Sequence, residues 1–188
     1  MKAMTAIARR ELYAYFATPV GWLCLCGFVS LTGFFFTFFT DDFVATVIRA
    51  VANPLQENTT DLNSDLIQPF FGMTAVIFLM LCPALSMRLL AEDRKQGSLE
   101  LLLSSPISSA QIVIGKYLGG LGFVTVMLAA TLPLTGLLYW MGSPDSGVMA
   151  GCYLATFLMC ASFLAVGMLT SSMSINQMGA LVLGGLSR

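Results

Sequence analysis

The sequence contains several apolar runs of the length that a membrane-crossing helix needs, which is about 20 residues for ~30 Å of hydrocarbon. These runs cover residues 20–39, 69–90, 112–141 and 148–169. A further apolar stretch, residues 175–188, is too short to cross easily before the sequence stops. The runs predict an all-α fold, a polytopic membrane helix bundle that forms a single transmembrane domain over residues 1–188.

The composition excludes several other classes of protein. Hydrophobic residues make up 57% of the chain and charged residues only 10%, against about a quarter charged residues in soluble domains. A soluble globular enzyme is therefore excluded, and so is a disordered chain, which needs low hydrophobicity and high net charge. Nine Lys and Arg against ten Asp and Glu give no basic surface for nucleic acid.

The sequence shows no pattern typical of a catalytic or metal-binding site. It has no histidine, which removes the commonest metal ligand and the usual general base. The five cysteines lie in apolar stretches without a CxxC pattern, so they are interpreted as small buried hydrophobes. We therefore expect no catalytic residue, no cofactor and no metal site.

The distribution of Lys and Arg predicts the orientation in the membrane, because cytoplasmic loops are enriched in both. Arg49 lies on one side of the predicted spans. The other side carries Lys2, Arg9, Arg10, Arg88, Arg94, Lys95 and Lys116. The N-terminus and the loop 91–110 are thus expected in the cytoplasm, with the loop 40–68 outside. The first run is longer than the ~7–15 residues of a signal-peptide core, so we expect an uncleaved anchor.

Residues 2–18 have the spacing of an amphipathic helix that lies along the membrane, and Thr18-Pro19 marks its end. Met4, Ile7, Leu12 and Tyr15 share the apolar face. Glu11 falls in the middle of this face, where a carboxylate is unfavourable unless it is paired. Either it reaches water at the rim of the helix, or a cation elsewhere in the fold pairs with it.

Local patterns also indicate features within and between the spans. Asp42 is placed to cap a short interfacial helix in the external loop. Pro83 and Pro133 can kink their helices. Lys116 and Arg88 are near span ends, from which their side chains can reach water. Small residues form one face of the third run, at Gly115, Gly119, Gly120 and Gly122, and such a face permits close helix contact.

The cytoplasmic loop carries the most specific pattern. Gly97 is suited to end the preceding helix, and Ser98 can cap a new one that has Glu100 in its first turn. Leucines make that short helix apolar and Pro106 stops it. The element could present a rigid contact to a cytoplasmic partner, or it could be an ordinary interfacial connector.

Residues 88–106 read RLLAEDRKQGSLELLLSSP, and this stretch resembles the first cytoplasmic loop of ABC-2 type transporter permeases. Residues 9–19, RRELYAYFATP, are similar to the N-terminal interface helix of that family. Together they most resemble the short permeases of the gliding-motility type. The family has six spans, so the resemblance implies that this chain stops within the fifth.

The resemblance implies a permease that pairs with a second permease half and with separate ATP-binding subunits. It further implies that a coupling helix in the loop docks onto the ATPase. The positions that match the motif are Glu92, Asp93, Arg94, Gly97, Ser98, Glu100 and Leu101. On this interpretation the chain is an ABC transporter permease, most readily an exporter.

The sequence itself contains no ATP-binding loop. At the single Gly-Lys pair, Gly115-Lys116, Ala110 replaces the first glycine and Tyr117 the Ser or Thr of that motif. Energy for transport must then come from a partner. The alternative is a non-transporting scaffold or assembly subunit that docks a cytoplasmic partner through the 91–106 loop.

Overall fold

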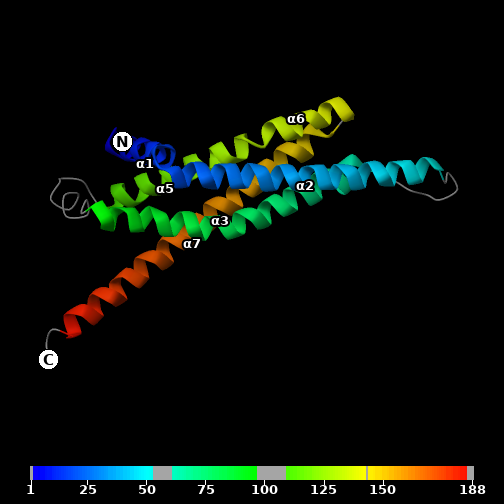
Figure 1. Ribbon diagram of the computed structural model, residues 1–188. Coiled ribbons are helices and arrows are strands. Elements are labelled where there is room, and N and C mark those ends of the chain that lie inside the picture. Colours follow the sequence, from blue (N-terminus) through cyan, green and yellow to red (C-terminus); the bar gives the residue numbers. More distant parts are fainter. Residues whose placement is uncertain (1, 53–60, 97–108, 143, 186–188) are drawn as a thin grey trace. The chain divides into compact units, whose positions relative to one another are not determined.

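The protein is described by a computed structural model that covers residues 2–52, 61–96, 109–142 and 144–185 (Figure 1). These residues are almost entirely helical and contain no strand. The elements are α1 (Lys2–Ala17), α2 (Pro19–Ala52), the π-helix η1 (Asn63–Ile67), α3 (Gln68–Gln96), α5 (Ser109–Ala129), α6 (Leu132–Met141) and α7 (Ser146–Gly185). The prediction of an all-α polytopic bundle is confirmed.

Four helical stretches are long and apolar enough to cross a membrane. They are Pro19–Ala52, Asn63–Ser86, Ala110–Trp140 and Ser146–Thr170. Each overlaps one of the four long runs found in the sequence. Where each span enters and leaves the bilayer stays a prediction.

Helix α2 corrects the expectation of a separate short helix that begins at Asp42. It continues without a break through Asp42 to Ala52, and the point at which the external loop begins stays a prediction. The polar residues here are accommodated within the helix, because Thr40 Oγ1 donates to the Phe36 carbonyl at 2.7 Å and Thr46 Oγ1 to the Asp42 carbonyl at 3.0 Å. No glycine or proline lies between Gly33 and Pro54 to end the helix.

The third predicted span is broken into α5 and α6 at Ala130 and Thr131. The break follows from Pro133, which has no N–H to offer the Ala129 carbonyl four residues earlier. The Thr131 hydroxyl and N–H both donate to the Leu128 carbonyl, at 2.7 and 3.0 Å. Pro133 thus acts more strongly than the expected kink, whereas α3 continues through Pro83.

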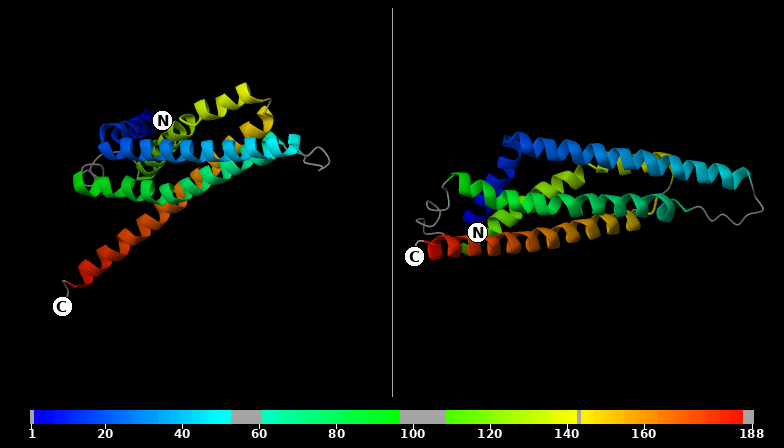
Figure 2. Two further views of the ribbon diagram at one scale, coloured as in Figure 1. Left: turned by 45° about the vertical axis from the view of Figure 1, so that its right-hand side comes forward. Right: turned by 60° about the horizontal axis from the view of Figure 1, so that its bottom comes forward.

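Helix α7 is continuous between the fourth and fifth apolar runs, and the boundary between these two spans stays a prediction. It is one helix of 40 residues, which corresponds to ~60 Å, about twice the hydrocarbon thickness. Figure 2 shows it as an uninterrupted helix in both views. No proline occurs in it, and residues 171–177 contain no glycine, so nothing in the backbone chemistry ends the helix near residue 170.

The helices pack into two compact units. Unit 1 contains the described residues within Met1–Ala17, Leu79–Phe123 and Cys160–Arg188, and unit 2 those within Thr18–Phe78 and Val124–Met159. In unit 2, Phe36 of α2 meets Phe70 of α3 edge to face, with 5.5 Å between the ring centroids. The buried cluster around this pair comprises Phe36, Leu66, Ile67, Phe70, Phe71, Leu138 and Met149.

Candidate functional site

The residues predicted to couple the chain to a partner begin at the end of α3. Glu92, Asp93 and Arg94 lie in the last turns of this helix, which ends at Gln96. Gly97, Ser98, Glu100 and Leu101 lie outside the described residues, as does the short helix expected after Gly97. Helix α3 ends at Gln96, directly before Gly97, which the sequence had indicated as the residue that ends it, and α5 begins at Ser109.

In unit 1, α1 contacts both helices that flank this loop, α3 and α5. The apolar face of α1 lies on the small-residue face of α5. A Cβ atom placed on Gly115 would lie 2.8 Å from Ile7 Cγ2, and one on Gly119 would lie 2.6 Å from Glu11 Cβ. Only glycine permits helices to approach this closely, so the predicted small-residue face is used for helix contact.

The structure shows what the apolar face of α1 contacts. Ile7, Glu11 and Leu12 lie against α5. Tyr13, on the opposite side of the helix, is 75% exposed. The position of α1 relative to a membrane surface stays a prediction.

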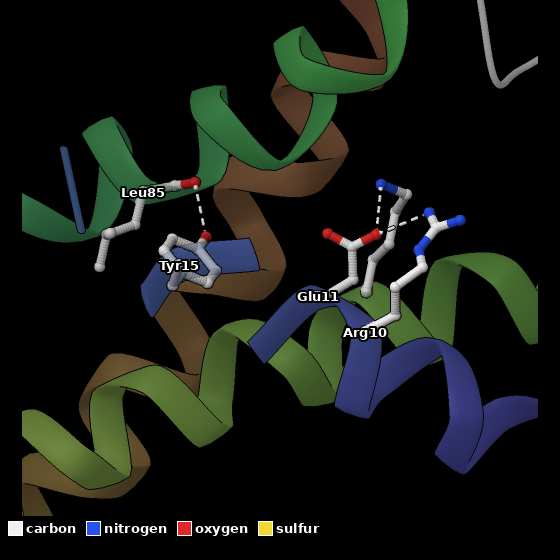
Figure 3. Close-up of polar contacts among 5 residues, drawn as sticks. Arg10, Glu11, Tyr15 and Leu85 are labelled. Atoms are coloured by element: carbon white, nitrogen blue, oxygen red, sulfur yellow. Dashed lines mark hydrogen bonds and ion pairs between the residues drawn. The ribbon is translucent and has the colours of Figure 1, made fainter. Parts of the chain in front are cut away.

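Glu11 is paired with a cation, which decides between the two alternatives left open by the sequence. Lys116 Nζ of α5 donates to Glu11 Oε1 at 3.3 Å, and Arg10 Nη2 donates to the same oxygen at 3.2 Å (Figure 3). Glu11 is 8% exposed and Lys116 only 3%. Lys116 therefore does not extend to water, as its place near a span end had suggested, but lies buried in the contact with α1.

Tyr15 connects α1 to both neighbouring helices. Its ring stacks on Phe123 of α5, with centroids 4.5 Å apart and planes inclined by 13°. Its hydroxyl donates to the Leu85 carbonyl of α3 at 3.5 Å, a long hydrogen bond (Figure 3). Helix α1 thus contacts the helix that precedes the coupling loop and the helix that follows it.

The buried charges of Glu11 and Lys116 favour the position in which α1 is packed on α5. A buried carboxylate without a cation is strongly unfavourable, and removing one member of a buried pair typically costs about 3–5 kcal/mol. The pair therefore contributes little net stability over an apolar contact of the same shape, but it strongly opposes separation of α1 from α5.

Sequence reasoning identified the parts of this contact separately but did not join them. Glu11 on an apolar face, the glycine face and Lys116 were each noted. Lys116 is the only charged residue between Arg94-Lys95 and Asp145 apart from Glu100, a signal that could have made it the partner of Glu11. The contact of Tyr15 with Leu85 had no signal in the sequence, because it joins a side chain to a backbone carbonyl 70 residues away.

The described residues include no group of three or more His, Cys, Asp or Glu side chains that could hold a metal ion. The candidate site therefore rests on the contact of α1 with α3 and α5, and the coupling function of the adjoining segment stays a prediction.

Comparison with known proteins gives a family match over most of the chain. The profile of the family described as ABC-2 family transporter protein matches residues 5–184. No solved structure matches the chain.

Two curated relatives are similar over part of their length. Both are named "Probable multidrug ABC transporter permease YbhR", one from Escherichia coli strain K12 and one from Escherichia coli O157:H7. Each is 29% identical over 136 residues, which is 72% of this chain and 34% of the relative. The matched region therefore spans about a third of the length of these relatives.

Proposed function

Since the chain belongs to the ABC-2 transporter family and is thus a membrane subunit of an ABC transporter, we propose that it exports a cargo with ATP hydrolysed by a separate ATP-binding subunit. The sequence has no ATP-binding loop of its own, so the energy has to enter through a contact. The similar Escherichia coli proteins carry the name of multidrug permeases, which supports export of small molecules.

The coupling contact is proposed for residues 92–101, with Glu92, Asp93 and Arg94 at the end of α3 and Gly97, Ser98, Glu100 and Leu101 beyond it. The observation that carries this proposal is the bridging position of α1. Through Tyr15 it contacts α3, and through Ile7, Glu11 and Leu12 it contacts α5. These contacts of α1 would therefore oppose a displacement of the loop between α3 and α5. We call them the clamp: Tyr15 on α3, and Ile7, Glu11 and Leu12 on α5.

We assign the clamp a mechanical role in coupling. When the ATP-binding subunit closes, it displaces the loop, and α5 moves with α1 because the buried ion pair and the glycine contact oppose their separation. The spans then pivot between an inward-open and an outward-open arrangement. Glu11 and Lys116 are positioning residues in this scheme, since neither is proposed to touch the cargo or the ATPase.

The proposal includes the orientation and the assembly of the chain. The Lys and Arg bias places the N-terminus and the loop in the cytoplasm, where an ATP-binding subunit is available. A second permease half, identical or different, would complete the transport path within the bacterial inner membrane.

A binding experiment tests the proposed coupling contact. The chain is co-expressed with each candidate ATP-binding cassette protein of its source organism, solubilised and captured through a tag. Glu100→Arg should abolish co-purification of the ATPase, because a cation replaces the carboxylate in the docking helix. Asp42→Arg is the matched control, since it makes the same charge change on α2, and it should leave the complex intact.

The result also separates transport from scaffolding. If the chain binds the ATP-binding protein and the complex hydrolyses ATP faster when cargo is added, the result supports the permease. A complex that survives Glu100→Arg contradicts the coupling contact, and a bound ATPase whose activity never responds to the chain favours the scaffold.

A further inference from the structure

Unit 2 contains a hollow between α6 and α7 that the coupling mechanism does not use. Its volume is about 310 Å³, at the lower end of the range for small-molecule pockets, about 300–1,000 Å³. Both helices line it over successive turns, with Thr135, Gly136 and Tyr139 on α6 and Ser146, Met149 and Tyr153 on α7 among the lining residues. The hollow therefore runs along both helices.

One wall of the hollow is fixed by a cluster of hydroxyl groups. The Tyr153 hydroxyl lies 2.9 Å from Thr131 Oγ1 and 2.9 Å from Thr135 Oγ1. Both threonines are buried, and the Tyr153 ring meets Phe71 edge to face with 4.8 Å between centroids. The break between α5 and α6 at Thr131 is what brings these hydroxyl groups together, and it gives the hollow a rigid aromatic wall.

The rim of the hollow offers hydrogen bonds that the protein does not use. Within the described part of the chain, neither the Tyr139 hydroxyl nor the Ser146 hydroxyl has a hydrogen-bond partner. Tyr139 is 51% exposed. An occupant could thus bury an apolar body against Met149 and the aromatic wall while it bonds these two groups.

The lack of charged side chains among the described lining residues indicates which kind of occupant the hollow favours. None of the described residues that line it is an Asp, Glu, Lys or Arg, and α6 and residues 146–170 of α7 also carry none. The nearest charge in sequence is Asp145, whose Oδ1 accepts the Gly147 N–H at 2.8 Å. A phosphate would meet no cation here and a carboxylate close by, which disfavours an anionic lipid.

We propose that the hollow between α6 and α7 binds an uncharged amphipathic small molecule with an apolar, ring-sized body and one or two hydrogen-bonding groups. This inference goes beyond the coupling mechanism, since binding needs neither ATP nor the ATP-binding subunit. Its failure would leave the coupling proposal standing, and the reverse is also true.

The geometry supplies a matched pair of variants. A Cβ atom at Gly136 meets nothing within 4 Å, and the same holds for Gly27 on α2. Gly136→Leu therefore adds bulk to the lining of the hollow from a position with open space, whereas Gly27→Leu makes the same change at a glycine that does not line this hollow. Both replace a helical glycine with a better helix former, so neither is expected to unfold the chain, and far-UV circular dichroism checks this.

The test uses energy transfer from Trp140, which neighbours Tyr139, to the neutral probe N-phenyl-1-naphthylamine. Trp22→Phe leaves Trp140 as the single donor, because the chain has two tryptophans. The purified chain in a non-ionic detergent should give saturable transfer above the linear background of micelle partitioning. Gly136→Leu should weaken binding at least ~10-fold and Gly27→Leu should not. Tyr139→Phe should weaken it by about 2- to 13-fold, the loss of one hydrogen bond.

Two results would overturn the proposal. One is equal affinity of the probe for Gly136→Leu and Gly27→Leu, since the hollow would then not be the site. The other is displacement of the probe by phosphatidylglycerol but not by an uncharged competitor such as 1-naphthol, which would make the hollow an anionic-lipid site.

Discussion

Lys116 of α5 donates to the same carboxylate oxygen of Glu11 on α1 that Arg10 also contacts, at 3.3 and 3.2 Å. The Lys116 side chain is 4% exposed and the Arg10 side chain 56%, so the two cations are not equivalent. Water screens the Arg10 contact, and a pair exposed to this extent contributes little. The buried Lys116 is the cation that determines whether Glu11 can remain between α1 and α5.

The ion pair predicts that the single substitution destabilises the protein far more than the double substitution does. Lys116→Met leaves the Glu11 carboxylate buried without its main partner and should destabilise unit 1 by about 3–5 kcal/mol. Glu11→Leu combined with Lys116→Met replaces the pair by apolar groups and should lie close to the wild type. Thermal unfolding in detergent, followed by circular dichroism, measures both. Equal destabilisation by the single and the double variant would contradict the pairing.

The glycine contact predicts that bulk on α5 displaces α1. Gly119→Leu cannot be accommodated where a Cβ atom would lie 2.6 Å from Glu11 Cβ, so α1 should separate from α5. Limited trypsin digestion should then cleave faster at Arg9 and Arg10, by at least ~10-fold, because helices must open locally to be cut. Gly33→Leu, where a Cβ atom has open space, is the control. Unchanged cleavage of Gly119→Leu would show that α1 does not dock there.

Much of this arrangement could be anticipated from the sequence, and the reason is physical. Apolar runs of membrane-spanning length have few ways to satisfy their backbone groups, so the helices around residues 20–39 and 148–169 were predictable. The end of α2 was harder, because the hydroxyl groups of Thr40 and Thr46 bond within the helix and no glycine or proline lies between Asp42 and Pro54. Partners distant in sequence were hardest, as with Glu11 and Lys116, because no local pattern fixes a contact 105 residues apart.

Tyr15 should act through its ring more than through its hydroxyl. Tyr15→Phe removes the 3.5 Å hydrogen bond to the Leu85 carbonyl and should cost less than about 1.5 kcal/mol. Tyr15→Ala also removes the stacked contact with Phe123 from a residue that is 4% exposed, and should cost about 3–5 kcal/mol. The same unfolding measurement distinguishes them. A Tyr15→Phe loss as large as that of Tyr15→Ala would make the link to α3 the dominant contact.

The clamp predicts a specific defect in coupling. In the double variant Glu11→Leu with Lys116→Met, stability is expected to be retained, but no ion pair opposes the separation of α1 from α5. The complex with its ATP-binding subunit should then hydrolyse ATP at close to the wild-type rate while transport per ATP falls by about 3- to 10-fold, as expected for the loss of 0.7–1.4 kcal/mol of coupling. Parallel assays of phosphate release and cargo uptake into inverted vesicles measure the ratio. An unchanged ratio would restrict the pair to a structural role.

We propose above all that the segment after α3 binds an ATP-binding subunit. Photo-crosslinking in living cells tests this contact most directly. A photoreactive benzoylphenylalanine is placed at Leu101, with a second position at Val51, on the far end of α2, as the control. The account predicts an adduct at Leu101, and none at Val51, with a protein whose peptides contain an ATP-binding loop. An adduct-free Leu101, or an adduct there with an extracytoplasmic protein, would contradict it.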